Sequence, residues 1–198
     1  MIEVFKIEGK DEKVLLNEVD CNEIHYIVNE IPGKLFKSKK YELKYIKQDD
    51  IKEFIKEFIL NLGKSLKIDI KSEMIYKNDC YNLVLDSEDN SLIIGKDGRT
   101  LNSIQLLIHQ IISNLTNFNI RINVDVANYK EKKQKRLESE IKKIAKEVSE
   151  SKIEAKLDPM NSYERRLVHT IISEYKNLET ESFGENPERY VVIRFKED

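Results

Sequence analysis

The chain has 198 residues, with 34 basic and 36 acidic side chains and a formal net charge of -2. At about 100 to 200 residues per domain, this length holds one large domain or two to three small ones, and it excludes a large multidomain enzyme. Hydrophobic residues make up 40% and charged residues 35% of the chain, with no Trp and only six Gly. This composition excludes a disordered chain and a fibrous repeat, and the near-neutral total gives no general attraction for a polyanion.

Neither a targeting segment nor a metal site is expected. The N-terminal residues lack the basic flank and apolar run of a signal peptide, and no stretch approaches the roughly 18 apolar residues of a membrane helix. Cys21 and Cys80 stand without a second Cys or a His at metal-ligand spacing, which indicates reduced structural thiols. The sequence therefore predicts a cytoplasmic protein with no integral membrane segment, no metal and no cofactor.

A small α/β module is expected at 1–48. Residues 2–7 predict a strand and residues 11–19 a short helix, and two further strands flank Pro32-Gly33. Apolar and charged residues alternate at 41–45, as in a half-buried strand. A module boundary is expected directly after this strand.

Residues 51–128 predict a second module, which begins with an amphipathic helix. Apolar residues recur at steps of three and four across 51–62. Asp50 and Glu53 form a capping-box pattern at its start. Gly63 supplies the expected stop.

Two strands and a helix, helix, strand sequence complete this module. Alternation predicts strands at 66–70 and 81–85, joined through a turn at 77–79. A short apolar helix, a glycine loop, a helix whose apolar stripe reaches Leu115, and a strand at 120–126 follow. The order helix, strand, strand, helix, helix, strand indicates an α+β fold.

Residues 129–198 predict a third module of helices on a small sheet. Capping-box patterns at 128–131 and 161–164 precede its two helices. The expected elements are helices across 137–148 and 162–175, a strand ending near Phe183, and a last strand at 190–195.

The loop Gly95-Lys96-Asp97-Gly98 is the most informative motif. A phosphate-binding P-loop has four residues between its glycines and this loop has two, which argues against nucleotide hydrolysis. Two glycines let the backbone approach a sugar-phosphate chain closely, the next helix offers unpaired N–H groups, and Lys96 and Arg99 add positive charge. A helix-turn-helix corner that merely needs two glycines is the alternative interpretation.

The loop and the element order around it resemble the KH domain in its bacterial, type II arrangement, with the order αββααβ. In that family an Ile-Gly-x-x-Gly element grips the backbone of about four single-stranded nucleotides, while the bases lie against an apolar groove. Asp97 departs from the basic or neutral residue of many family members and makes the inner pair of the loop net neutral. The resemblance implies a contact loop of Ile94, Gly95, Lys96, Asp97, Gly98 and Arg99.

A second constellation consists of Arg165 and His169, which lie four residues apart and so share one helix face. A surface pair without function is the alternative. The Pro-Met break before this helix, and the Ser-Phe-Gly segment and terminal strand after it, resemble the domain named for an Arg and a His that are separated by three residues. That family binds single-stranded nucleic acid, which implies contacts from Arg165 and His169, with Arg166 and Arg189 as weaker candidates.

The last third of the chain is net positive, with 16 basic and 15 acidic side chains at 129–198. Five positive charges and one negative charge fall within 130–136. This run predicts electrostatic help in binding a polyanion, and a solvated helix face is the alternative. The candidate residues are Lys130, Lys132, Lys133, Lys135 and Arg136.

A KH domain followed by an Arg-xxx-His domain, behind a short α/β module, resembles the bacterial Jag family, also called KhpB or EloR. The resemblance covers essentially the whole chain, with modules at 1–48, 51–128 and 129–198. It implies a cytoplasmic single-stranded RNA-binding protein, an RNA chaperone or post-transcriptional regulator that influences cell elongation and envelope synthesis. It also implies pairing with a small KH-only partner protein or with itself through the KH domain, and DNA is an alternative ligand.

Helix geometry singles out Leu106. At about 100° per residue, the apolar stripe of this helix spans Leu107 through Ile112, and Leu106 projects nearly opposite. A single exposed Leu is ordinary. The sharper hypothesis is that Leu106 marks a surface where another KH domain packs.

The leading interpretation is a non-enzymatic binder of single-stranded RNA. The rival is an adaptor whose domains serve protein contacts at membrane or cell-wall machinery, with incidental RNA binding. Catalysis is not expected, because His25, His109 and His169 fall in three different modules and no carboxylate cluster or nucleophile–base pair has a hydrolase spacing.

Overall fold

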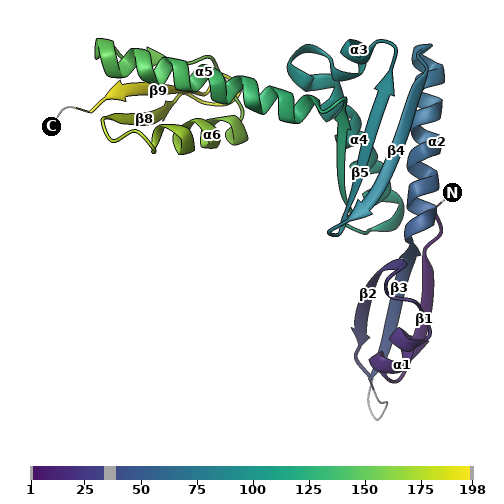
Figure 1. Ribbon diagram of the computed structural model, residues 1–198. Coiled ribbons are helices and arrows are strands. Elements are labelled where there is room, and N and C mark those ends of the chain that lie inside the picture. The colour runs from purple at the N-terminus through teal and green to yellow at the C-terminus, as the bar shows by residue number, and fades with distance from the viewer. Residues whose placement is uncertain (1, 34–38, 197–198) are drawn as a thin grey trace. The chain divides into compact units, whose positions relative to one another are not determined.

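The computed structural model describes residues 2–33 and 39–196 (Figure 1). The chain divides into two compact units, one up to Ala127 and one from Asn128 on. Three small sheets, each of three strands, and six α-helices make up the described residues. The predicted α+β class is confirmed.

The first sheet has the strand order β1-β3-β2 and is antiparallel throughout. Its elements are β1 (Phe5–Gly9), α1 (Glu12–Asn17), β2 (Ile24–Ile31) and β3 (Lys40–Lys47). Asp11 caps α1 by accepting a hydrogen bond from the Lys13 N–H at 2.8 Å. Leu15 packs so closely on Gly9 that a Cβ there would lie 2.9 Å from its side chain. The predicted elements are present, although β1 begins three residues later and α1 is shorter than expected.

The first helix of the KH-like part starts without a linker, since α2 (Gln48–Leu66) follows β3 directly. The predicted Asp50–Glu53 capping box is wrong, because the N-cap is Lys47 and no side chain caps this end. The prediction of a separate module at 1–48 stays a prediction, because β3 and α2 join within one compact unit.

Gly63 does not stop α2, contrary to the prediction. The helix continues to Leu66 and ends at Lys67, which adopts the left-handed conformation with φ 56°. Gly63 is instead a point of close approach, because a Cβ there would lie 2.7 Å from the Ile68 carbonyl oxygen. The predicted strand at 66–70 is wrong for the same reason, since those residues end the helix and connect it to the sheet.

The second sheet has the strand order β4-β5-β6, with β4 and β5 antiparallel and β5 and β6 parallel. Asn78 and Asp79 make the turn between β4 and β5 with positive φ values of 53° and 54°. The predicted order αββααβ is confirmed. After α2 the elements are β4 (Ile70–Lys77), β5 (Cys80–Ser87), α3 (Asn90–Ile94), a 3-10 turn (Lys96–Gly98), α4 (Arg99–Thr116) and β6 (Arg121–Val126).

The buried stripe of α4 differs from the predicted one. Leu107 and Leu115 are exposed, although both were expected in the stripe. Leu106 is also exposed, as the helical angle predicted. The helix packs on β6 through a narrower face, so it buries residues at steps of three and four only. These residues are Leu101, Ile104, Ile108 and Ile112.

The C-terminal unit packs two helices with an antiparallel sheet of order β7-β9-β8. The predicted capping box at 161–164 is confirmed, with hydrogen bonds of 3.0 Å in both directions. The one predicted at 128–131 is wrong, because Asn128 is left-handed and its side chain caps nothing. The two-residue strand β7 was not predicted. The elements are α5 (Tyr129–Ser151), β7 (Ala155–Lys156), α6 (Ser162–Ile172), β8 (Leu178–Phe183) and β9 (Tyr190–Phe195).

Candidate nucleic-acid interface

The glycine loop between α3 and α4 depends on a residue without a Cβ at Gly95. Its backbone has φ 68° and ψ -179°, a region that essentially only glycine occupies. A Cβ there would lie 2.1 Å from Thr100 Oγ1. The Gly95 N–H donates to the Ser91 carbonyl at 2.8 Å and ends α3. The turn therefore forms only with glycine at this position.

The rest of the loop turns charged side chains outward at the start of α4. Asp97 and Gly98 are both left-handed, with φ 56° and 82°. Lys96, Asp97 and Arg99 are all exposed, and Gly98, the N-cap residue, offers no side chain to the first N–H groups of α4. Two cations and a helix N-terminus thus meet at a surface where the backbone has no bulk, which suits a phosphate oxygen.

Apolar surface lies on the helix that enters the loop. Ile93 is buried and Ile94 half-buried, whereas Leu92 is exposed on α3. The sequence interpretation named Ile94 and missed Leu92, although Leu92 adjoins Ile93 in the same short helix. An exposed Leu beside the loop offers a face against which an unstacked base can lie.

Arg165 differs in its placement from the expected surface contact. It is 8% exposed, and its Nη1 donates to the Met160 carbonyl at 2.8 Å. Its Nη2 donates to Ser162 Oγ at 3.4 Å. The guanidinium therefore ties the segment before α6 to the helix, and its role is to position that segment.

His169 is held from both ring nitrogens by hydroxyl groups of β8. Nδ1 lies 2.7 Å from Thr180 Oγ1 and Nε2 lies 2.9 Å from Ser182 Oγ. Burial lowers the pKa of His169 below its ordinary value of 6.5, and the positive charge of Arg165 lowers it further. The ring is therefore neutral at neutral pH, with one nitrogen donating and the other accepting.

Comparison with known proteins covers both regions. Residues 52–126 match the KH domain of the KhpA/KhpB family, and residues 135–195 match the domain named for its Arg-xxx-His motif. The RNA-binding protein KhpB of Clostridium symbiosum is 33% identical over 151 residues, which cover 76% of this chain and 67% of that protein. The chain belongs to the KhpB family.

Two other relatives extend the comparison. The RNA-binding protein KhpB of Bacillus subtilis is 28% identical over 166 residues, covering 82% of this chain and 79% of the relative. That of Lactiplantibacillus plantarum is 29% identical over 140 residues, which cover 71% of this chain but 44% of the relative. The matched share of the relatives' own length thus varies widely. Among the described residues, no helix is long and apolar enough to span a bilayer.

The two weaker candidates of this KhpB family member have different surroundings. Arg166 is exposed on α6. Arg189 is half-buried, and its Nε is buried without a hydrogen-bond partner within the described part of the chain. The Met160 N–H donates to the Arg189 carbonyl at 3.0 Å, so Met160 connects Arg189 with Arg165. A buried donor that lacks a partner suits an incoming oxygen atom.

The basic run on α5 is partly neutralised by carboxylates. Lys133 Nζ lies 2.8 Å from Glu164 Oε1, the same side chain that caps α6. Lys135 pairs with Glu131 on its own helix. Lys132 and Arg136 are exposed, and Lys130 is half-buried. The run is therefore a mixed surface rather than the uniform positive patch that its composition predicts.

Tyr163 is an exposed aromatic residue that the sequence interpretation missed. Its side chain is 63% exposed at the start of α6, and its hydroxyl donates to Gln134 Oε1 of α5 at 2.9 Å. Tyr163 and Arg166 lie three residues apart and so face the same side of the helix. An anchored ring beside an exposed guanidinium suits the stacking of an unpaired base.

The lowered pKa of His169 predicts a specific pH dependence. Because the folded pKa lies below the value of 6.5 in the unfolded chain, the stability that the neutral ring provides is present above about pH 6.5 and is lost as the pH falls through the folded pKa. Titration of the His169 ring signals by NMR is expected to give a midpoint below 6.5. A midpoint at or above that value would contradict the buried, hydroxyl-bonded ring.

Proposed function

We propose that this protein binds single-stranded RNA through the KH loop at 94–99, with a second contact on the Arg-xxx-His domain. The observation that carries the proposal is Gly95, whose backbone conformation and contact with Thr100 bring the bare backbone and two cations to one surface. The relatives are named RNA-binding proteins, which supports RNA over other polyanions. DNA is an alternative ligand of the same chemistry.

The second contact is proposed on α6 and its surroundings. Arg166 and Tyr163 supply the exposed cation and ring, Arg189 supplies a buried donor, and His169 supplies a neutral ring. Arg165 acts as a positioning residue. Among the basic residues of α5, Lys132 and Arg136 are exposed and add electrostatic attraction, whereas Lys133 and Lys135 are engaged with carboxylates.

We further propose three modules, at 1–48, 51–128 and 129–198, in a cytoplasmic binding protein rather than an enzyme. The family resemblance supports a role as an RNA chaperone or post-transcriptional regulator, with an influence on cell elongation and envelope synthesis. An adaptor function, with incidental RNA binding, is the alternative.

Charge reversal at Lys96 tests the loop. Lys96→Asp is expected to weaken binding of an oligouridine strand about ten-fold or more at physiological salt, because it replaces an attraction for phosphate with a repulsion. Lys142→Asp on α5 reverses the same type of charge outside the proposed contacts and serves as the matched control. Fluorescence anisotropy of the labelled strand measures both affinities. Equal losses in the two variants would exclude the loop as the contact site.

Self-association or pairing with a KH-only protein is proposed at the exposed apolar face of α4. Leu106, Leu107 and Leu115 are all exposed on this helix. Leu106→Lys is expected to reduce the mass measured by light scattering to that of a monomer with helicity unchanged, because a charge there opposes apolar packing. Leu60→Lys, at an exposed Leu of α2, is the control. An unchanged mass in a chain that is oligomeric before substitution would contradict this interface.

A further inference from the structure

The strand β2 forms an unprotected edge of the first sheet. It pairs with β3 over eight consecutive residues without a bulge, and among the described residues no strand pairs with its outer side. Natural edge strands are usually blunted by Lys, Pro or a bulge, or covered by another element. The span Ile24–Ile31 contains no Lys and no Pro, and α1 packs on β1 and β3. The outer N–H and C=O groups of β2 are therefore available to an added strand.

Apolar side chains accompany this edge on both faces of the sheet. Tyr26, Ile27 and Ile31 are 43%, 40% and 38% exposed. Tyr26 points to one face, whereas Ile27 and Ile31 point to the other. A strand added at β2 would cover apolar surface on both faces, which is the arrangement expected of a binding edge.

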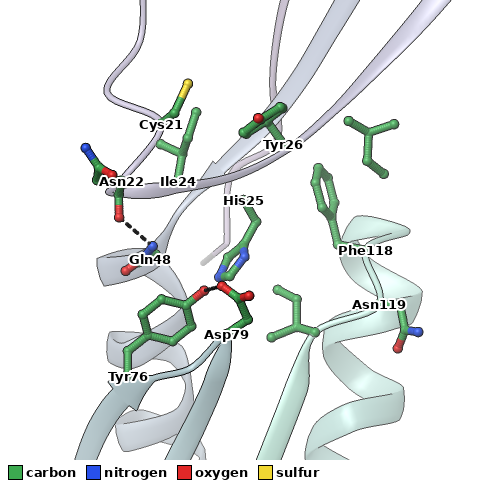
Figure 2. Close-up of a pocket in the computed structure, with 12 residues that line it drawn as sticks. Cys21, Asn22, Ile24, His25, Tyr26, Gln48, Tyr76, Asp79, Phe118 and Asn119 are labelled. Carbon is green, nitrogen blue, oxygen red and sulfur yellow. Dashed lines mark hydrogen bonds between the residues drawn. The ribbon is translucent and has the colours of Figure 1, made fainter. Parts of the chain in front are cut away.

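A pocket of about 580 Å³ opens beside the N-terminal half of β2 (Figure 2). It is framed by well-anchored residues, since His25 Nε2 lies 2.9 Å from Tyr81 OH and Gln48 Nε2 donates to the Asn22 carbonyl at 2.8 Å. Aromatic rings and one carboxylate line it from three segments of the chain. These lining residues include His25, Tyr26, Tyr76, Asp79 and Phe118.

Acidic side chains dominate the charge around this end of β2. Asp79 is the only Asp, Glu, Lys or Arg in the lining of the first pocket as described. A second pocket of about 490 Å³ shares Ile24 and Gln48 with the first. Its charged wall has four carboxylates and two ammonium groups, and Lys52 Nζ lies 2.8 Å from Asp49 Oδ1. The charged residues are Glu18, Asp20, Glu23, Asp49, Lys47 and Lys52. This excess of negative charge repels a nucleic-acid strand and attracts a basic segment.

We propose that β2 is the docking edge for an extended, basic segment of a partner protein. The segment adds to the sheet beside β2 as a fourth strand, and one of its Lys or Arg side chains enters the pocket next to Asp79 and the ring of Tyr76. Main-chain hydrogen bonds along β2 supply affinity, and the aromatic and acidic pocket supplies specificity. The residues of this surface are distinct from those of the proposed RNA contacts.

A random peptide library displayed on phage, selected on the full chain, tests the proposal. Enriched peptides are expected to alternate β-branched or aromatic residues with polar ones and to carry a Lys or Arg. Their affinity is expected to fall at least ten-fold for Ile27→Lys, which places a charge on the edge, and for Asp79→Asn. Val14→Lys, at an exposed position of α1, is the matched control and is expected to bind normally.

Three further results distinguish the occupant. Slowed amide hydrogen exchange along β2 on peptide binding would support strand addition, and Ile31→Lys supplies a second edge variant if Ile27→Lys is unfolded. Failure of any peptide to enrich, or equal binding by the edge variants and the control, would overturn the proposal. Displacement of the peptide by oligouridine would assign the edge to RNA, and peptide-free dimerisation abolished by Ile27→Lys would assign it to a second copy; either overturns the proposal.

Discussion

Gly95→Ala is expected to lower RNA affinity by at least about ten-fold and to destabilise the first unit by about 1 to 3 kcal/mol. The added methyl group meets Thr100 Oγ1, and the backbone conformation at φ 68° and ψ -179° is unfavourable for alanine. The loop must then open or shift, which moves Lys96 and Arg99 away from the phosphates. Chemical denaturation and anisotropy of a labelled strand measure the two effects.

Gly184→Ala is the matched control for this variant. Gly184 also has a positive φ, of 79°, but its nearest neighbour to an added Cβ is the Glu188 carbonyl at 3.2 Å. Alanine there is expected to cost stability of the second unit and to leave loop-dependent RNA binding intact. Normal RNA affinity in a folded Gly95→Ala chain would show that the loop geometry is not required.

Arg165 and Arg166, neighbours on α6, are expected to fail in opposite ways. Arg165→Ala removes the donor to the Met160 carbonyl and a buried side-chain stem, and is expected to destabilise the second unit by about 2 kcal/mol or more. Arg166→Ala removes an exposed cation and is expected to change stability by less than about 0.5 kcal/mol. The same substitution is expected to reduce RNA affinity about three- to ten-fold.

Denaturation curves and RNA titrations of the two variants separate positioning from contact. Arg165→Lys tests the assignment further, because an ammonium group keeps the charge but cannot reproduce the two guanidinium hydrogen bonds. It is therefore expected to be destabilised as well. A stable Arg165→Ala chain with weakened RNA binding would instead make Arg165 a direct contact.

The order of the KH elements could be predicted because each element has a clear period and a clear turn. The alternation along β5 and β6 and the glycines of the loop are local signals, and the structure follows them. Helix ends were less accessible. Gly63 looks like a stop in the sequence, but its function is close packing against the Ile68 carbonyl, which only the fold brings near.

The candidate site shows the same division between local and distant information. Spacing places Arg165 and His169 on one helix face, but it does not reveal that the guanidinium folds back onto Met160. Composition reveals the basic run on α5, but not that Lys133 pairs with Glu164, a residue distant in the sequence. Tyr163 was missed because an aromatic residue at a helix start carries no signal of exposure.

RNA binding at the KH loop and on α6 can be mapped by photo-crosslinking the full chain to an oligonucleotide that contains 4-thiouridine, followed by mass spectrometry of the adducts. Adducts are expected within 94–99 and within the α6 segment that carries Tyr163 and Arg166. In Lys96→Asp the first set is expected to disappear and the second to remain. Adducts confined to other parts of the chain, with none in the loop, would contradict binding through the KH loop.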